Sequence, residues 1–200
     1  MPGKRASEDV RREQILRAAF EVASREGIGG LTVRAVAAEA EVSHALVIFH
    51  FQRKERLVHE LLDWLIETTS VLRVSDDIAH FPRALDRLHA LLQQEMSRLS
   101  HQPRHTRLFF EYWALGARQE WVRERIGAEL KRYRAAFRAV MEELLLADPG
   151  PPSAGVTPDG LAAVAVSWIH GCAVQAMIDP GHFDTDEYLA AVRGMVGQLA

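Results

Sequence analysis

The side chains best suited to chemistry are concentrated in residues 32–58, TVRAVAAEAEVSHALVIFHFQRKERLV. Thr32 and Ser43 carry the short hydroxyl side chains that cap helix N-termini, and apolar residues follow each of them at helical spacing. This pattern predicts two short helices separated by a tight turn. The second helix can turn Val47 and Phe51 inward, which leaves most of its other side chains on the outer face. Such an outer face is typical of a helix-turn-helix, which presents its second helix to the major groove of DNA.

Residues 42–58, VSHALVIFHFQRKERLV, resemble the V-S-x-x-x-L-Y-x-Y-F-x-x-K-E-x-L-L signature of the TetR family of transcriptional repressors. The preceding TVRAVAAEA is similar to the helix before that signature. The chain departs from the family pattern at Ile48 and His50, where Tyr is usual, and at Glu41, where Gly is common in the turn. The residues that fall in register without a gap are Val42, Ser43, Val47, Phe51, Lys54, Glu55 and Leu57.

The resemblance implies an all-α fold of about nine helices, with a helix-turn-helix DNA-binding domain at residues 1–56 and a ligand-binding and dimerisation domain at 57–200. The helical periodicity of the chain gives the same count, and no segment shows the alternation of a β-strand. We expect homodimerisation through the last two helices. The expected helices span about 7–26, 32–40, 43–51, 54–75, 82–101, 106–117, 120–146, 159–178 and 184–199.

The second helix of the motif and the starts of its neighbours are the candidate DNA contacts. Ser43, His44 and His50 could hydrogen-bond to base edges, whereas the apolar side chains on the outer face could read bases only by contact, for instance with a thymine methyl. Arg53 and Lys54 stand where side-chain charge and free backbone amides can together hold a phosphate. The predicted DNA-binding residues are Thr32, Arg34, Ser43, His44, Ala45, Leu46, Ile48, Phe49, His50, Arg53 and Lys54.

The distribution of charge also indicates that the N-terminal part of the chain binds DNA. The net charge is −3, but residues 1–57 contain ten Lys and Arg against eight Asp and Glu, so this part is positive while the remainder is negative. Four basic residues near the N-terminus could form an arm that touches DNA, or equally a solvated tail; they are Lys4, Arg5, Arg11 and Arg12.

A second group of residues is aromatic and polar, and could line a cavity for a small effector whose identity the sequence does not give. The FEYWA run at residues 110–114 is faintly similar to the choline-responsive betaine repressors, which implies a cage for a quaternary ammonium group that includes Glu111. The alternative is that these rings are ordinary core residues. The candidate effector-binding residues are Phe109, Tyr112, Trp113, Trp168, His170, Cys172 and Gln175.

Catalysis and metal binding find little support. On a helix, His170 and Cys172 point roughly 200° apart, so they form no nucleophile–base pair. Pro103 lies between His101 and His105 and spoils the helical spacing of a metal site. We therefore expect no catalytic residue, metal or cofactor.

The composition suits a cytoplasmic protein without a membrane partner. A single cysteine excludes an internal disulfide, and we expect neither a signal peptide nor an apolar run long enough to span a bilayer. The sequence thus favours a homodimeric DNA-binding regulator, a repressor relieved by a ligand and bound to a near-palindromic operator. Two alternatives remain at this stage: a helical binding module that does not bind DNA, and an enzyme built on a helical cavity.

Overall fold

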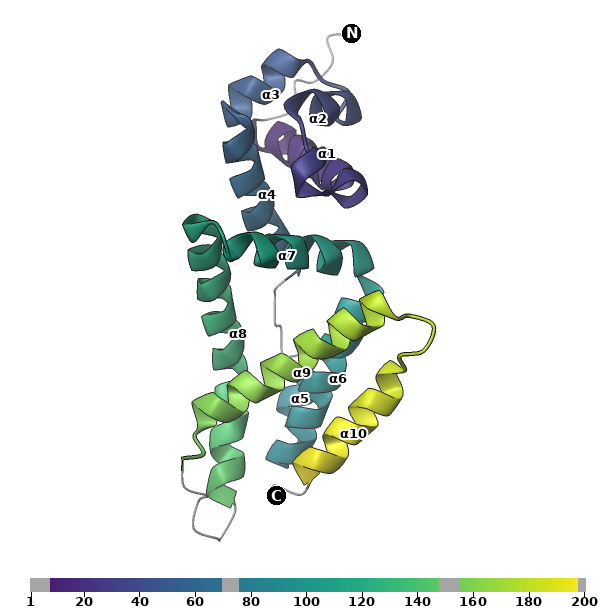
Figure 1. The fold of residues 1–200 in the computed structure, drawn as a ribbon. Helices are drawn as coiled ribbons and strands as arrows, with labels where there is room; N and C mark the ends of the chain where they lie inside the picture. Colours follow the sequence, from purple (N-terminus) through teal and green to yellow (C-terminus); the bar gives the residue numbers. More distant parts are fainter. Residues whose placement is uncertain (1–7, 70–75, 148–154, 198–200) are drawn as a thin grey trace. The chain divides into compact units, whose positions relative to one another are not determined.

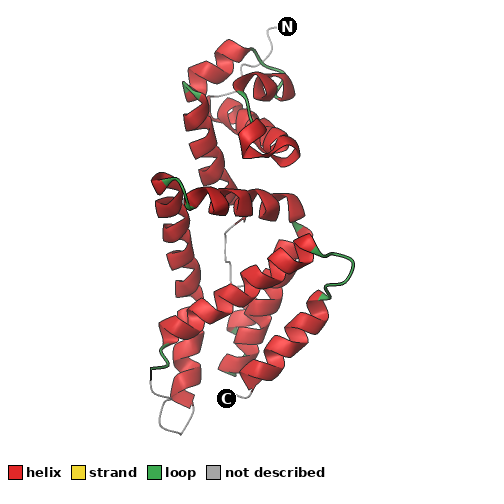
Figure 2. Cartoon of the chain, in the orientation of Figure 1, coloured by secondary structure: helices red, strands yellow, loops and turns green. Residues whose placement is uncertain are grey.

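The computed structural model describes residues 8–69, 76–147 and 155–197, and all regular structure in these ranges is helical (Figures 1 and 2). The predicted all-α fold is confirmed. The described ranges contain ten helices, because one additional turn of helix, α5, forms where the sequence indicated only an interruption. The helices are α1 (Glu8–Gly30), α2 (Val33–Glu39), α3 (His44–Phe51), α4 (Lys54–Thr69), α5 (Asp76–Ala79), α6 (Ala84–His101), α7 (Pro103–Gly116), α8 (Glu120–Ala147), α9 (Pro158–Ile178) and α10 (Thr185–Gly197).

The chain forms two compact units. The N-terminal unit consists of Met1–Ser70 and Arg107–Arg123, and the C-terminal unit consists of Val71–Thr106 and Glu124–Ala200. The boundary expected after residue 56 falls inside α4, which belongs wholly to the N-terminal unit. Helices α7 and α8 each contribute residues to both units.

The N-terminal unit is built around the apolar faces of α1 and α4. The periodic apolar stripe of α1 packs against α2 and α4. Burying a leucine side chain contributes about 2 kcal/mol to the free energy of folding. Packing against these apolar faces therefore stabilises short helices that would not be stable alone. The most deeply buried residues of the two helices are Ile15, Ala19, Val22, Ala23, Leu57, Leu61, Leu62, Leu65 and Ile66.

Gly27 ends the regular part of α1. Its backbone lies at φ 74° and ψ 168°, a conformation that glycine adopts without steric cost, and the helix resumes for one turn after this kink. A Cβ atom at position 27 would lie 3.3 Å from Oε2 of Glu111. Gly27 therefore permits both the kink and the close approach of α7.

The turn between α2 and α3 is a Schellman motif. The amide of Val42 donates to the carbonyl of Ala37 at 3.0 Å, and the amide of Glu41 donates to the carbonyl of Ala38 at 3.2 Å. Glu41 has a φ of 54°, the left-handed conformation that this motif requires and that usually falls to glycine. The substitution noted in the sequence thus places an exposed glutamate in a strained backbone position.

Helix α9 is at the centre of the C-terminal unit, where it packs against α6 and α10 (Figure 1). By length and composition α9 could cross a membrane, so the expectation that no such apolar run exists was wrong. Its inner face contributes six buried residues: Ala162, Ala165, Val166, Ile169, Cys172 and Ala173.

Replacing Glu41 by glycine should stabilise the protein. The substitution removes the left-handed strain, which costs about 1–2 kcal/mol, and adds a glycine entropy cost of about 0.5–1 kcal/mol. The free energy of unfolding should therefore rise by up to about 1.5 kcal/mol. Urea denaturation of Glu41→Gly and Glu41→Ala measures this effect. The alanine variant keeps the strain, so equal stability of the two variants would contradict the explanation.

Candidate nucleic-acid interface

Side-chain caps fix where α2 and α3 begin. Oγ1 of Thr32 accepts a hydrogen bond from the amide of Ala35, and Oγ of Ser43 accepts one from the amide of Leu46, each at 3.1 Å. Both residues have the extended backbone of an N-cap. The two hydroxyl groups are exposed, and each retains a proton that it can donate to a phosphate.

The outer face of α3 carries a small, mainly apolar set of side chains. His44, Ala45 and Phe49 are exposed, and Leu46 and Ile48 are half-buried. Phe49 has 71% of its surface exposed, so it is not part of the hydrophobic core of the unit. An exposed short helix behind a capped turn is the geometry that a major groove accepts.

His50 lies on the inner side of α3, so its predicted place on the outer face was wrong. Only 8% of its surface is exposed, and its ring meets that of Phe49 edge-on with the centroids 5.2 Å apart. The sequence spacing could have predicted this inner position, because His50 follows the buried Val47 by three residues and precedes the buried Phe51 by one.

Arg12 holds the end of α3 in place. Its guanidinium donates to the carbonyl of His50 at 3.1 Å, pairs with the carboxylate of Glu60 on α4, and lies 5.0 Å from the centre of the Phe51 ring. Arg12 is therefore a positioning residue rather than part of a basic arm, and no local sequence signal indicated this role. Lys4 and Arg5 lie outside the described residues.

At the start of α4 the two candidate phosphate-binding cations differ. Nζ of Lys54 donates to the carbonyl of Gly29 at 3.4 Å, so its side chain is half-buried against the end of α1. Arg53 is exposed immediately before the first residue of α4. Arg34 is exposed on α2 and offers a further cation.

Side chains of α7 form hydrogen bonds with α1 and α4, the helices that flank the helix-turn-helix. Arg107 donates to the carbonyl of Ser24 in α1, Glu111 accepts from the amide of Ile28 at 3.0 Å, and the Tyr112 hydroxyl donates to the carbonyl of Val58 in α4 at 2.8 Å. Tyr112 is completely buried, and burial is the main cause that raises the pKa of its hydroxyl. This predicted effector residue is therefore a structural link inside the N-terminal unit.

The remaining candidate effector residues lie in both units. Phe109 and Trp113 form a ring cluster with Phe110 on α7, in which Phe110 and Trp113 stack at 5.7 Å. The other four lie on α9: Trp168, His170, Cys172 and Gln175. Cys172 is completely buried, which raises the pKa of its thiol, whereas Gln175 is exposed.

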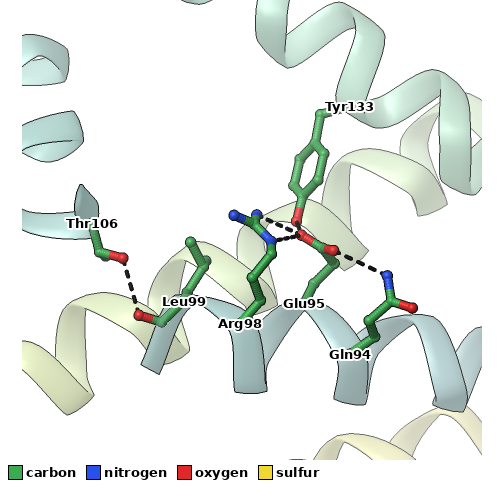
Figure 3. Close-up of polar contacts among 6 residues, drawn as sticks. All are labelled: Gln94, Glu95, Arg98, Leu99, Thr106 and Tyr133. Carbon is green, nitrogen blue, oxygen red and sulfur yellow. Dashed lines mark hydrogen bonds and ion pairs between the residues drawn. The ribbon is translucent and has the colours of Figure 1, made fainter. Parts of the chain in front are cut away.

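A buried polar cluster in the C-terminal unit surrounds Glu95 (Figure 3). This completely buried carboxylate accepts hydrogen bonds from Nη2 of Arg98 at 2.6 Å and from the hydroxyl of Tyr133 at 2.8 Å. The ring of His170 stacks on Tyr133 with the centroids 5.8 Å apart. Burial, and then the charge of Arg98, lowers the pKa of His170 to about 4. The sequence analysis did not predict this cluster. The position of Glu95 next to Met96, on the apolar face of a helix, could have indicated a buried carboxylate.

A cleft of about 890 Å³ opens in the N-terminal unit, within the range that small ligands occupy. The ends of α1 and α7 and the starts of α4 and α8 line it, and Lys54 and Glu111 are among its residues. The rings of His59 and Trp121 lie against each other in its wall, tilted by 32° with their centroids 3.6 Å apart. None of the seven candidate effector residues lines this cleft.

Comparison with known proteins identifies the family. Residues 15–61 match the sequence model of bacterial regulatory proteins of the tetR family, and residues 84–200 match that of the BetI-type transcriptional repressor C-terminal domain. The chain belongs to the TetR family, with a BetI-type C-terminal region. It is a DNA-binding transcriptional regulator and not an enzyme, so the alternative of a module without DNA binding is not supported.

Individual relatives agree with this assignment. An HTH-type transcriptional regulator from the dhlA 5′ region of Xanthobacter autotrophicus is 29% identical over 193 residues, covering 92% of this chain and 88% of the relative. The regulator BetI of Stenotrophomonas maltophilia is 26% identical, covering 86% of each chain. A TetR transcription regulator from Haloarcula marismortui has the same fold, with a TM-score of 0.72 at 21% identity, covering 96% of this chain and 97% of that one.

Removing the Arg53 guanidinium should weaken DNA binding through the loss of one phosphate contact. We expect Arg53→Ala to reduce the slope of log affinity against log salt concentration by about 1. Fluorescence anisotropy with labelled duplex DNA at several salt concentrations measures this slope. Arg138→Ala, which removes an exposed cation from α8 in the C-terminal unit, should leave the slope unchanged. An unchanged slope for Arg53→Ala would exclude a phosphate contact at this residue.

The lowered pKa of His170 makes stability depend on pH. Its ordinary pKa of 6.5 applies to the unfolded chain, which therefore binds one more proton than the folded protein between pH 6.5 and about 4. The contribution of His170 to the free energy of unfolding is fully present above pH 6.5 and should fall by about 3 kcal/mol as the pH drops to 4. Urea unfolding at pH 7, 6, 5 and 4 should show a shallower decline for His170→Phe than for the native chain. Equal declines would show that His170 does not titrate this way.

Proposed function

We propose that this TetR-family regulator binds a near-palindromic operator as a homodimer and is released from it by a small ligand. The observation that supports the DNA-binding half of this proposal is the exposed outer face of α3, which is held by the N-cap Ser43 and by Arg12. A single eight-residue helix makes too few contacts for useful specificity, so two copies of it are needed. A regulator that acts on DNA in a bacterial cell works in the cytoplasm.

Helices α9 and α10 supply the proposed dimer interface. Val164 and Ile178 on α9 leave 43% and 74% of their surfaces exposed, and Met195 on α10 leaves 50% exposed. Exposed apolar side chains on adjacent helices are typical of surfaces that pair with a second copy, and two such helices from each protomer form a four-helix bundle. The inner side of α10 belongs to the protomer's own core, because Leu189, Val192 and Val196 are buried there.

Regulation by a ligand requires a physical connection to the reading helix, and α7 provides one. The helix begins in the C-terminal unit, and its later residues bond to α1 and α4 through Arg107, Glu111 and Tyr112. A ligand that prefers one position of α7 would thereby prefer one position of the helix-turn-helix. Only a difference in ligand affinity between the two positions can shift operator binding.

The proposed effector is a small organic molecule that contacts α7 or α9. Structural neighbours bind different ligands: FadR from Bacillus subtilis was crystallised with stearoyl-CoA, and a protein from Saccharomonospora viridis with choline. The predicted residues offer two alternative places for such a site: Phe109 and Trp113 on α7 in the N-terminal unit, or Trp168, His170 and Gln175 on α9 in the C-terminal unit. Tyr112 and Cys172 fit poorly, since both side chains are completely buried.

The first test is a titration of the purified protein against duplexes that tile the DNA upstream of its own gene, supplemented by a randomised duplex pool. We expect tight binding to one duplex with a steep dependence on salt. Failure to enrich any duplex from the pool would reject the operator proposal. Candidate effectors are then added to the complex, and a molecule that binds the protein without changing operator affinity would not be its effector.

Placing a charge in the proposed interface should separate the protomers. We expect Ile178→Asp to give a monomer in analytical ultracentrifugation and to bind the operator at least tenfold more weakly, because burying an unpaired carboxylate is costly. Leu146→Asp is the matched control, since Leu146 on α8 is 80% exposed and lies outside the proposed interface. A dimeric Ile178→Asp protein would place the interface elsewhere.

A further inference from the structure

The outer face of α3 offers almost no hydrogen-bonding groups for reading bases. The sequence of the helix, HALVIFHF, contains no Arg, Lys, Asn or Gln, the residues that pair with guanine or adenine through two hydrogen bonds. His50 is buried, so the imidazole of His44 is the one exposed polar side chain within α3. The hydroxyl of Ser43, just before the helix, already accepts the amide of Leu46.

Phe49 dominates this face instead. Its ring is 71% exposed, yet it is not loose, because it contacts the buried ring of His50 edge-on at 83°. Ala45 lies one turn earlier on the same side of the helix and is also exposed. Its short side chain leaves room for a base edge beside the phenyl ring. Together the two residues form an exposed apolar strip at the centre of the reading helix.

The major groove presents one apolar group that such a strip can recognise, the C5 methyl of thymine. We infer that Phe49, with Ala45 beside it, reads the operator by packing against thymine methyl groups. The half-site then contains A·T pairs beneath the middle of α3, and its recognition depends on methyl contacts rather than on paired hydrogen bonds. Phe49 is thus a specificity-determining residue, and this inference rests on the proposed operator binding.

Deoxyuridine tests the inference directly, because it pairs like thymidine and lacks only the methyl group. In an operator enriched from the randomised pool, each thymidine is replaced in turn by deoxyuridine, and the affinity is measured by fluorescence anisotropy. Burying one methyl group contributes about fourfold in affinity, so the native protein should bind about fourfold more weakly at each contacted position. Replacements outside the half-sites should have no effect.

Two variants assign the contact to its residue. Phe49→Ala should bind the thymidine and deoxyuridine duplexes equally at the positions where the native protein distinguishes them, while its salt dependence stays unchanged. His44→Ala should retain the distinction, since its imidazole is not part of the apolar strip. Circular dichroism checks that each variant is folded, which is expected because both side chains are exposed.

The outcomes separate this inference from the proposed function. Tight, salt-dependent operator binding that no deoxyuridine substitution weakens by twofold would overturn methyl reading and leave the regulator intact. A preference for thymidine that survives in Phe49→Ala would overturn the role of Phe49. If no duplex binds, both proposals are overturned, and the exposed phenyl ring is left as a contact for a different macromolecule.

Discussion

The arrangement of the helix-turn-helix depends on the guanidinium of Arg12. Helix α3 has eight residues and is too short to be stable alone, so its orientation comes from contacts made outside it. Arg12 supplies three of these at once: a hydrogen bond to the carbonyl of His50, an ion pair with Glu60 on α4, and a position over the ring of Phe51. Because the pair is partly buried, water screens it less than an exposed pair. One side chain of α1 therefore sets the position from which α3 meets DNA.

The same unit is connected to α7 by hydrogen bonds that use backbone groups as partners. Arg107 and Tyr112 donate hydrogen bonds to carbonyls of α1 and α4. Glu111 accepts a hydrogen bond from the backbone amide that follows the kink at Gly27. Such bonds are insensitive to the identity of the α1 and α4 side chains, so the reading surface can change without loss of the connection. A movement of α7 would act on the positions of α1 and α4, which carry the contacts of Arg12.

Two features, one in each unit, are of opposite kinds: a buried charge and an exposed aromatic ring. The C-terminal unit buries the charge of Glu95, which Arg98 and Tyr133 compensate with direct hydrogen bonds (Figure 3). The N-terminal unit leaves 71% of the surface of Phe49 exposed to water. A compensated buried charge orders a core, whereas an exposed aromatic ring gains free energy only by contact with another molecule. The first feature therefore concerns the fold and the second concerns recognition.

Local patterns in the sequence determined the features that depend on neighbouring residues along the chain. The caps at Thr32 and Ser43 and the kink at Gly27 follow from side-chain oxygens and backbone sterics within a few residues, and the periodic apolar stripes predicted nearly all the helices. Tertiary contacts decided the rest, because they join positions far apart in sequence. Arg12 lies 38 residues from the carbonyl it bonds, and Tyr133 lies 38 residues from Glu95. Periodicity showed that α10 has an apolar face, but only packing decided that this face fills the protomer's own core.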